Sequence, residues 1–286
     1  MDTKEEIIRF IKVMIAQYEY QGAVVGISGG IDSAVVAALC VNALGKDKVL
    51  GLLLPERDSA PETLTDSIAV CDYLGIDRII KPITGILKKM GIYKLQPSSL
   101  LVPRKIQEKY VKNKLKSIAE EDVFLQDLQN KGDQEMLNGQ AYYRAKHRIR
   151  MACLYFEAEK RNYAVIGTTN HTEAMTGFYV KWGDDSSDIE PLAHLYKTQV
   201  YAIAEELKIP RAIKAKAPSP DLIPGITDEY ILGLTYPELD GILIKIENNL
   251  PLNGIAHEKI DRVQQIIKAA QKRNLRNATL GLIVGG

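Results

Sequence analysis

The sequence has few of the residues on which disulfide-rich, metal-clustered or thiol-dependent proteins rely. Its 286 residues include only three cysteines and four histidines. Cys40, Cys71 and Cys153 are widely spaced, so we interpret them as small buried apolar residues and not as disulfide partners, metal ligands or a nucleophile. The histidines have no metal-ligand spacing, and no chemistry is assigned to them.

The chain also lacks an excess of charge of one sign and lacks long hydrophobic runs. Its formal net charge of +1 gives no reason to expect a nucleic-acid or membrane partner. The longest apolar runs are far too short to cross a bilayer, and residues 1–6 are charged, with no signal-peptide core. We therefore expect a cytoplasmic protein, and a hydrophobic content of 46% supports a substantial core.

Short β-branched runs alternate along the chain with longer segments of helical periodicity. The strand pattern occurs at residues 23–27, 49–54, 76–80 and 163–167. The helical pattern occurs at residues 4–19, 31–44, 60–74, 140–159, 198–208 and 260–271. This alternation predicts an α/β fold, a doubly wound parallel sheet flanked by helices, with ligands at the carboxyl ends of the strands.

Two segments interrupt the alternation. Residues 94–138 are rich in charged residues, with a helix-like stretch at 105–119, and they are either a solvated helical insertion or a lid or partner surface. Residues 215–228 contain three prolines and a glycine in close succession, which predicts a loop. Because no repeat or sharp boundary is visible, we expect residues 1–286 to form one domain.

The segment 23–39 has the pattern of a buried strand, a glycine-rich turn and a helix. Such a turn presents backbone N–H groups at the positive end of the helix dipole, where an anion such as phosphate binds. Asp32 would repel that anion unless a cation lies between them, which implies Mg²⁺. The segment is neither a Walker A loop nor GxGxxG. The candidate residues for binding the anion and its cation are Ser28, Gly29, Gly30, Ile31, Asp32 and Ser33, with Asp32 acting through the cation.

The plainer interpretation of this segment is an ordinary strand–turn–helix junction. In that case the glycines only permit the backbone conformation of the turn, and Asp32 only complements the helix dipole. The whole heptapeptide Ser-Gly-Gly-Ile-Asp-Ser-Ala favours the phosphate-binding interpretation.

A second cluster of polar residues follows the strand expected at 163–167. Residues 167–191 read GTTNHTEAMTGFYVKWGDDSSDIEP. Glu173 is a candidate second carboxylate for Mg²⁺ beside Asp32, and Thr168 is a candidate phosphate donor. Lys181 and Lys197 are candidates to neutralise negative charge on a leaving pyrophosphate. Each of these residues alone is more often a solvated surface residue.

These motifs resemble those of known enzymes. The first loop resembles the pyrophosphate-binding loop of the N-type ATP pyrophosphatases, which cleave ATP to AMP and pyrophosphate. GTTNHTEAMTGFYVKWGD, with LYKTQV at 195–200 and KAPSPDL at 216–222, resembles the ammonia-dependent NAD synthetases. The likeness covers residues 4–245 apart from 94–138, and it implies a Rossmann-like fold of the adenine nucleotide alpha hydrolase type.

The resemblance also implies an activity and roles for residues. A carboxylate of deamido-NAD would attack ATP, giving an acyl-adenylate and pyrophosphate, and ammonia would then displace AMP. Asp32, Glu173 and Lys197 would be catalytic, and Asp32 and Glu173 would hold the metal. ATP would contact residues 28–33, Thr168, Lys197 and Ser219, and the dinucleotide would contact Arg148, Lys181 and Asp184. A homodimer is implied, with nitrogen from free ammonia or from a separate ammonia-supplying chain.

Three features depart from the family pattern. Arg144 stands where an asparagine commonly lies near the nicotinate, so we count Arg144 among the substrate-binding candidates. The C-terminal His-Lys-Arg of the family corresponds at best to residues 271–273, which include Lys272. The insertion at 94–138 is long and charged. An alternative is therefore a related amide ligase acting on another carboxylate, such as nicotinate mononucleotide.

Overall fold

The computed structural model describes residues 3–95, 122–219 and 227–275. Its centre is a parallel sheet of β1 (Gly22–Gly26), β2 (Val49–Leu53), β3 (Asp77–Ile80) and β4 (Tyr163–Ile166), in the order β3-β2-β1-β4. Each strand agrees with its predicted range to within one residue at either end. The chain winds outward from β1 to β3 and then returns to the other side of β1, so the winding direction reverses between β1 and β4.

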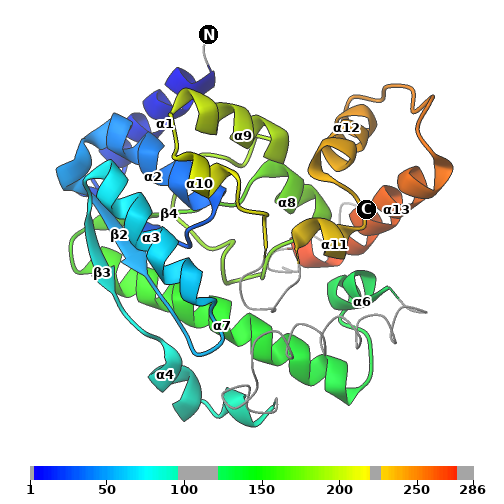
Figure 1. The fold of residues 1–286 in the computed structure, drawn as a ribbon, viewed down its shortest axis with the longest axis horizontal. Coiled ribbons are helices and arrows are strands. Elements are labelled where there is room, and N and C mark those ends of the chain that lie inside the picture. Colours follow the sequence, from blue (N-terminus) through cyan, green and yellow to red (C-terminus); the bar gives the residue numbers. More distant parts are fainter. Residues whose placement is uncertain (1–2, 96–121, 220–226, 276–286) are drawn as a thin grey trace, which may run out of the picture.

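Helices cover both faces of this sheet (Figure 1). Ala23 and Val25 of β1 face a core shared with α1 (Thr3–Gln17), α2 (Ile31–Leu44), α3 (Pro61–Leu74) and α9 (Lys197–Glu206). Val24 faces the opposite core, with α4 (Thr84–Lys89) and α7 (Gln134–Glu159). Successive strand residues point to opposite faces, so a sheet buried on both sides reads as a continuous apolar run. The predicted doubly wound α/β fold is confirmed.

The helix predicted at 140–159 begins earlier, at Gln134. The side chain of Asp133 accepts a hydrogen bond from the backbone N–H of Met136 and caps the first turn. Residues 134–139 lack apolar periodicity, so the sequence pattern did not indicate that the helix begins at Gln134. Within the predicted insertion, α6 (Val123–Gln129) is short and buries Phe124 and Leu128. The helix-like stretch at 105–119 lies outside the described residues.

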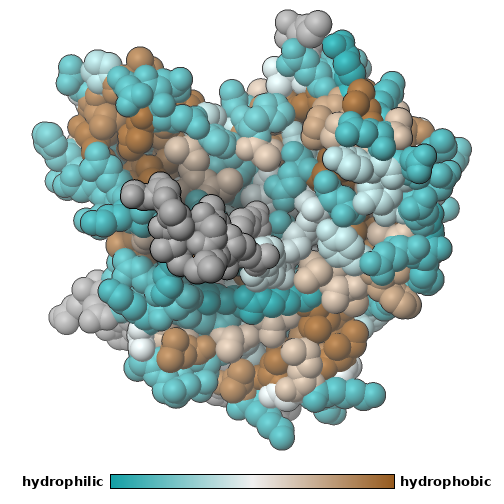
Figure 2. All heavy atoms as spheres, turned by 180° about the vertical axis from the view of Figure 1, so that it is seen from behind, coloured by the Kyte–Doolittle hydropathy of each residue, from teal (hydrophilic) through white to brown (hydrophobic). Residues whose placement is uncertain are grey.

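A second helical core lies beside the sheet. It is formed by α6, α12 (Tyr236–Glu247) and α13 (His257–Asn274), with α8 (His171–Thr176) and α11 (Asp228–Leu232) packed against it. Seen from behind, the surface is hollowed between the α12–α13 group and the rest of the molecule (Figure 2). The remaining elements are η1 (Lys46–Lys48), η2 (Ile92–Lys94) and α10 (Arg211–Lys214). The single-domain organisation of residues 1–286 stays a prediction.

The three cysteines are buried, as the sequence interpretation predicts. All three cysteines are free and buried, and burial raises the pKa of the Cys40 thiol to about 12. In the described ranges, no helix combines the length and the apolar character that a bilayer crossing requires.

Candidate active site

The glycine-rich turn lies at the carboxyl end of β1, where α2 begins. Gly29 has a φ of +72°, and a Cβ there would lie 2.7 Å from the Cβ of Asp66 and 3.1 Å from the backbone nitrogen of Ser67. Only glycine therefore lets α3 pack so closely against the turn. The side chain of Ile31 is buried in the core, so that residue offers only its backbone to a ligand.

Two serines fold this turn around the start of α2. The backbone N–H of Ser28 donates to Ser33 Oγ at 3.3 Å, and the Ser33 hydroxyl donates to the carbonyl of Gly30 at 3.0 Å. Ser28 Oγ accepts from the N–H of Gly30 at 3.3 Å. Among the described residues, no side chain caps the N-terminus of α2, so its first N–H groups remain available to an anion.

A buried lysine joins the two predicted metal-binding carboxylates. Lys197, the first residue of α9, is 2% exposed. Its Nζ lies 2.5 Å from Asp32 Oδ2 and 3.4 Å from Glu173 Oε1. Asp32 comes from the first turn of α2 and Glu173 from α8, so three elements meet at one cation. The three predicted catalytic residues are therefore brought together.

Asn170 links the loop after β4 to Asp32, and the sequence analysis missed it. Its Nδ2 donates to Asp32 Oδ1 at 3.1 Å, and its side-chain oxygen accepts from the backbone of Glu173 at 3.0 Å. The Glu173 carboxylate in turn accepts from the backbone of Asn170 at 3.2 Å, which completes a capping box for α8. The spacing Asn-x-x-Glu is a readable start signal for a helix.

The buried carboxylate of Asp240 fixes the position of Lys197. The Thr172 hydroxyl donates to Asp240 Oδ1 at 2.6 Å and accepts from the backbone N–H of Lys197 at 2.9 Å. Asp240 Oδ2 accepts from the backbone of Thr198 at 2.8 Å. Asp240 thus holds the N-terminus of α9, and with it the start of the Lys197 side chain.

Burial and neighbouring charges shift the pKa values in this cluster. Burial would lower the pKa of Lys197, but the carboxylates of Asp32, Glu173 and Asp228 raise it above its usual range. Burial raises the pKa of the Glu173 carboxyl. The charge of Lys197 lowers this pKa, and the charges of Asp32 and Asp228 raise it further. Lys197 therefore stays protonated, and Glu173 holds a proton more tightly than a free carboxyl.

The predicted dinucleotide residues lie together beside this cluster. Arg148 donates from Nε and from a terminal nitrogen to the carbonyl of Lys181, at 3.3 and 3.2 Å. Asp184 Oδ1 accepts from the backbone N–H of Val180 at 2.6 Å. Thr169 Oγ1 donates to the carbonyl of Asp184 at 3.4 Å, which joins this group to the loop that carries Asn170. Arg148, Lys181 and Asp184 thus border one region.

Three other predicted residues, Thr168, Ser219 and Arg144, make no hydrogen bond or ion pair with that cluster within the described part of the chain. Thr168 is half-buried at the end of β4, and Ser219 is exposed at the end of a described segment. Arg144 donates to Asn130 Oδ1 at 2.6 Å and to Asp127 Oδ1 at 2.8 Å, so it fastens α7 to α6.

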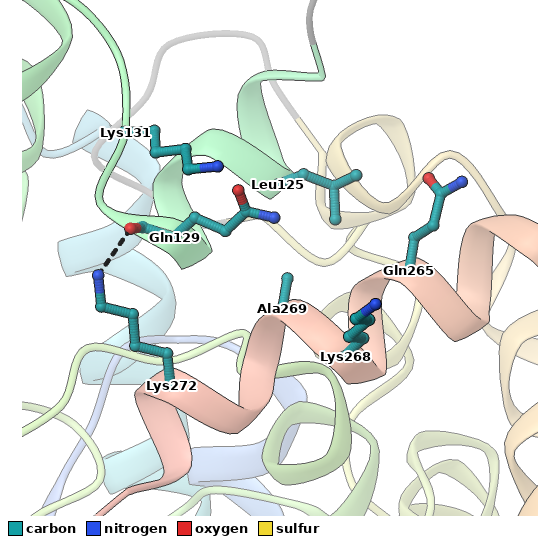
Figure 3. Close-up of a pocket in the computed structure, with 7 residues that line it drawn as sticks. All are labelled: Leu125, Gln129, Lys131, Gln265, Lys268, Ala269 and Lys272. Carbon is teal, nitrogen blue, oxygen red and sulfur yellow. Dashed lines mark hydrogen bonds between the residues drawn. The ribbon is translucent and has the colours of Figure 1, made fainter.

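Lys272 lies elsewhere, in a pocket between α6 and α13. Its Nζ donates to the carbonyl of Gln129 at 2.9 Å (Figure 3). The pocket has a volume of about 530 Å³ and is lined by Leu125, Gln129, Lys131, Gln265, Lys268, Ala269 and Lys272. It shares no residue with the cluster at Lys197. The position of Lys272 therefore gives no support to a role in catalysis.

Comparison with known proteins identifies the family. The family model described as NAD synthase matches residues 3–120 and 96–277. An NH(3)-dependent NAD(+) synthetase of Thermotoga maritima is 54% identical over 269 residues, covering 94% of this chain and 95% of the relative. That of Methanocaldococcus jannaschii is 36% identical and covers 96% of each chain.

Solved structures agree with these relatives. NMN synthetase from Francisella tularensis has a TM-score of 0.74 at 26% identity, covering 97% of each chain. NH3-dependent NAD synthetase from Campylobacter jejuni, solved with a nitrate ion, has a TM-score of 0.71 at 26% identity, covering 98% of this chain and all of the other. The sequence motifs, the sheet and the relatives lead to one conclusion: the chain belongs to the NAD synthase family.

Proposed function

We propose that this chain is a C–N bond-forming ligase that amidates deamido-NAD to NAD⁺ with ATP and ammonia. The observation that carries the proposal is the Asp32–Lys197–Glu173 cluster beside the free N-terminus of α2. It combines an anion-binding helix end, two carboxylates and a buried cation at the carboxyl edge of a parallel sheet. Relatives named NH(3)-dependent NAD(+) synthetase, at up to 54% identity, support the same activity.

The reaction has two steps. In the first, a nicotinate carboxylate oxygen bonds to the α-phosphorus of ATP, the α–β phosphoanhydride bond breaks, and its electron pair leaves with pyrophosphate. In the second, the ammonia nitrogen bonds to the acyl carbon, the bond to the adenylate oxygen breaks, and AMP leaves while nitrogen loses a proton. Both steps depend on positioning and on neutralising charge.

The residues of the cluster have distinct roles in this proposal. The N–H groups and hydroxyls of residues 28–33 bind the phosphates, and Lys197 neutralises charge that develops on the leaving pyrophosphate. Thr168 and Ser219 add contacts to ATP. Arg148, Lys181 and Asp184 orient the dinucleotide so that its carboxylate faces the α-phosphorus.

Asp32 and Glu173 are the residues that would hold Mg²⁺. Their oxygens already share one cation, the Lys197 ammonium, at 2.5 and 3.4 Å, so the donor set suits positive charge. Mg²⁺ is usually held in such sites by one or two carboxylates together with substrate phosphates. Such an ion would neutralise phosphate charge, and Lys197 Nζ would shift to make room for it.

A related ligase would differ from the proposed enzyme in its acid substrate. One structural neighbour is an NMN synthetase, at 26% identity, whereas the sequence relatives at 54% and 36% are NAD synthetases. This difference favours deamido-NAD over nicotinate mononucleotide. The test is to supply each acid separately with ATP, Mg²⁺ and ammonium and to measure the amide product. Faster turnover of nicotinate mononucleotide would contradict the proposal.

We also propose a homodimer supplied by free ammonia or by a separate ammonia-supplying chain. Phe10 and Val13 lie one turn apart on the outer face of α1 and are 41% and 49% exposed. Such an apolar pair suits an interface with a second copy. Light scattering after size-exclusion chromatography tests this, and a monomer at micromolar concentration would contradict it.

A further inference from the structure

Three features of the sequence that depart from the family pattern meet at one carboxylate. They are Arg144 of α7, the tail at residues 271–273 and the insertion at 94–138, which contributes Asp127 of α6. Asp127 Oδ1 accepts a hydrogen bond from Arg144 at 2.8 Å, and Oδ2 accepts one from Arg273 at 2.8 Å. The backbone carbonyl of Asp127 accepts from the same two guanidinium groups, at 2.8 and 2.9 Å. One residue of the insertion therefore fastens α7 and α13 to each other.

These three residues, which we call the Asp127 clasp, are shielded and fixed in direction. The Arg144 and Arg273 side chains are 16% and 8% exposed. Each guanidinium group binds both the carboxylate and the carbonyl of Asp127, so its planar N–H donors have one orientation. An isolated exposed ion pair contributes little, whereas a network of charge-assisted hydrogen bonds holds its elements in place. In the fold, α6 lies between α13 and the first half of α7 (Figure 1).

A first route leads from the clasp to residues 177–182, which follow α8 and which we call the Lys181 loop. Arg273 donates from Nη1 to the carbonyls of Gly177 and Tyr179, at 2.9 and 3.1 Å. The next residue, Asn274, accepts from the Tyr179 hydroxyl at 2.5 Å. The end of α13 thus holds the start of the Lys181 loop, and Asp127 holds Arg273.

A second route reaches the same loop through α7. Arg148 lies one turn after Arg144 on this helix, and it donates to the carbonyl of Lys181. Both routes therefore end at residues that are proposed to orient the dinucleotide. Within the described part of the chain, no hydrogen bond or ion pair joins the clasp to residues 28–33, which are proposed to bind ATP.

We propose that Asp127 is a positioning residue for the acid substrate. Its clasp holds the Lys181 loop in the conformation that receives the dinucleotide, and Arg144 acts through Asp127 and not by contact with the acid. This inference rests on the proposed function, because it uses the assignment of Arg148 and Lys181 to the dinucleotide. It gives the insertion a role in substrate binding.

The test is the Asp127→Ala variant, studied by kinetics and by fluorescence. We expect the KM for deamido-NAD to rise about tenfold, because the loop must be ordered on binding, and kcat to change less than about threefold. The KM for ATP should change less than about twofold. Trp182, the only tryptophan of the chain, follows Lys181 in the loop. Acrylamide should therefore quench its fluorescence more strongly in the variant.

Asp122→Ala is the matched control on the same helix. Asp122 caps the N-terminus of α6 and pairs with Arg262 of α13, away from the clasp. Its loss should lower the Tm and leave both the KM for deamido-NAD and the quenching of Trp182 unchanged. Equal effects of Asp122→Ala and Asp127→Ala would indicate general loosening of α6 and would overturn the proposal.

A double-mutant cycle tests the part played by Arg144. Arg144→Ala should raise the KM for deamido-NAD, and adding Asp127→Ala should raise it no further, because both changes open the same clasp. Effects that multiply in the double variant would show that Arg144 acts independently of Asp127. If Asp127→Ala does not fold, Asp127→Asn, which keeps an acceptor oxygen but loses the charge, takes its place, with a rise of about threefold or more.

An unchanged KM for deamido-NAD in the folded Asp127 variant would overturn the proposal, whatever the fluorescence shows. Absence of NAD⁺ formation by the unmodified protein at saturating ammonium would instead contradict the proposed function. The quenching of Trp182 needs no turnover, so in that case it still decides whether the clasp holds the loop, and equal quenching in Asp127→Ala and the unmodified protein would show that it does not.

Discussion

At the scale of single residues, Lys197 has a structural role and a proposed catalytic role, and both require its ammonium group. Its ammonium group is buried and pairs with two carboxylates. During reaction it is proposed to face the leaving pyrophosphate. Breaking a buried ion pair by removing one partner leaves uncompensated charge, so Lys197 supports the fold as well as the chemistry.

Replacing Lys197 with glutamine should lower the rate of pyrophosphate release by about a hundredfold or more, because one preorganised charge at the transition state is lost. Release from ATP with saturating deamido-NAD and ammonium is the measurement. Lys214→Gln is the matched control, since Lys214 pairs with Glu205 on the exposed face of the molecule. A loss of similar size in both variants would contradict a specific role for Lys197.

Glu173 makes the stability of the unligated protein depend on pH. Its folded pKa is raised above the unfolded value of about 4, so the folded state binds its proton more tightly. Between that value and the raised one, the folded protein holds a proton that the unfolded chain has released. The contribution to stability is therefore present at low pH and is lost as pH rises. Asp228, with a folded pKa raised to about 6, acts in the same direction.

Glu173→Gln should therefore flatten the fall in Tm between pH 5 and pH 8 when neither Mg²⁺ nor nucleotide is present. The amide cannot release the proton, and it still provides an oxygen for the Asn170 backbone. Thermal unfolding at several pH values measures this. Glu258→Gln, an exposed change at the start of α13, should leave the slope as it is. An identical slope in Glu173→Gln would contradict the assigned cause.

At the scale of elements, the capping box of α8 connects helix formation to the site. Asn170 is fully buried, caps α8 and donates to Asp32. Asn170→Ala should cost about 1 to 2 kcal/mol of unfolding free energy and also lower kcat. Thr235→Ala removes the same kind of capping box from α12 and should lower stability without lowering kcat. Urea unfolding and steady-state kinetics separate these effects, and equal kcat losses would contradict the link to Asp32.

The loop after β2 is fastened to α7 by a buried charge network. Lys146 is fully buried, and its Nζ lies 2.8 Å from Glu56 Oε1 and 2.7 Å from Asp58 Oδ2. Lys146→Met removes the buried cation from Glu56 and Asp58, of which Asp58 keeps its ion pair with Arg57, and should cost about 3 to 5 kcal/mol. Lys160→Met, on the exposed end of α7, should cost less than about 1 kcal/mol. Urea unfolding measures both, and similar small losses would contradict a structural role for the network.

At the scale of the whole molecule, the order of the strands creates the site. The chain winds in one direction from β1 to β3 and then continues on the other side of β1 with β4. The loops that follow β1 and β4 therefore start at neighbouring strand ends and lead away from each other. Residues 28–33 leave β1 and residues 167–170 leave β4, so the anion-binding turn and Asn170 meet at the same edge. This is the place where open parallel sheets bind ligands.

Local signals made much of this predictable from sequence. Strand and helix periods are local features of the sequence, and they predicted the strands of the sheet and most of the helices. The glycine turn at 28–33 and the motif around Glu173 are local as well, and they identified the site candidates that the structure brings together. Long-range packing was not readable. The strand order depends on where each crossover docks, and the position of Asp228 depends on a hydroxyl from α12.

Charged residues with buried partners were the main omission. The sequence pattern of its helix predicts an exposed Lys146. In the structure, Lys146 pairs with Glu56 and Asp58, which lie far from it in the sequence. Arg144 stands at a position associated with substrate, yet its contacts are with α6. Asn170 was the exception, since its capping signal is local and was available in the sequence.

The most direct test of the proposed activity is pyrophosphate release from ATP and Mg²⁺ with ammonium, with and without deamido-NAD. Release should require deamido-NAD, match NAD⁺ formation mole for mole, and fall about a hundredfold or more in Asp32→Ala. Asp47→Ala, an exposed aspartate in η1, should behave like the unmodified protein. Release that proceeds without deamido-NAD, or that survives in Asp32→Ala, would contradict both the activity and the site.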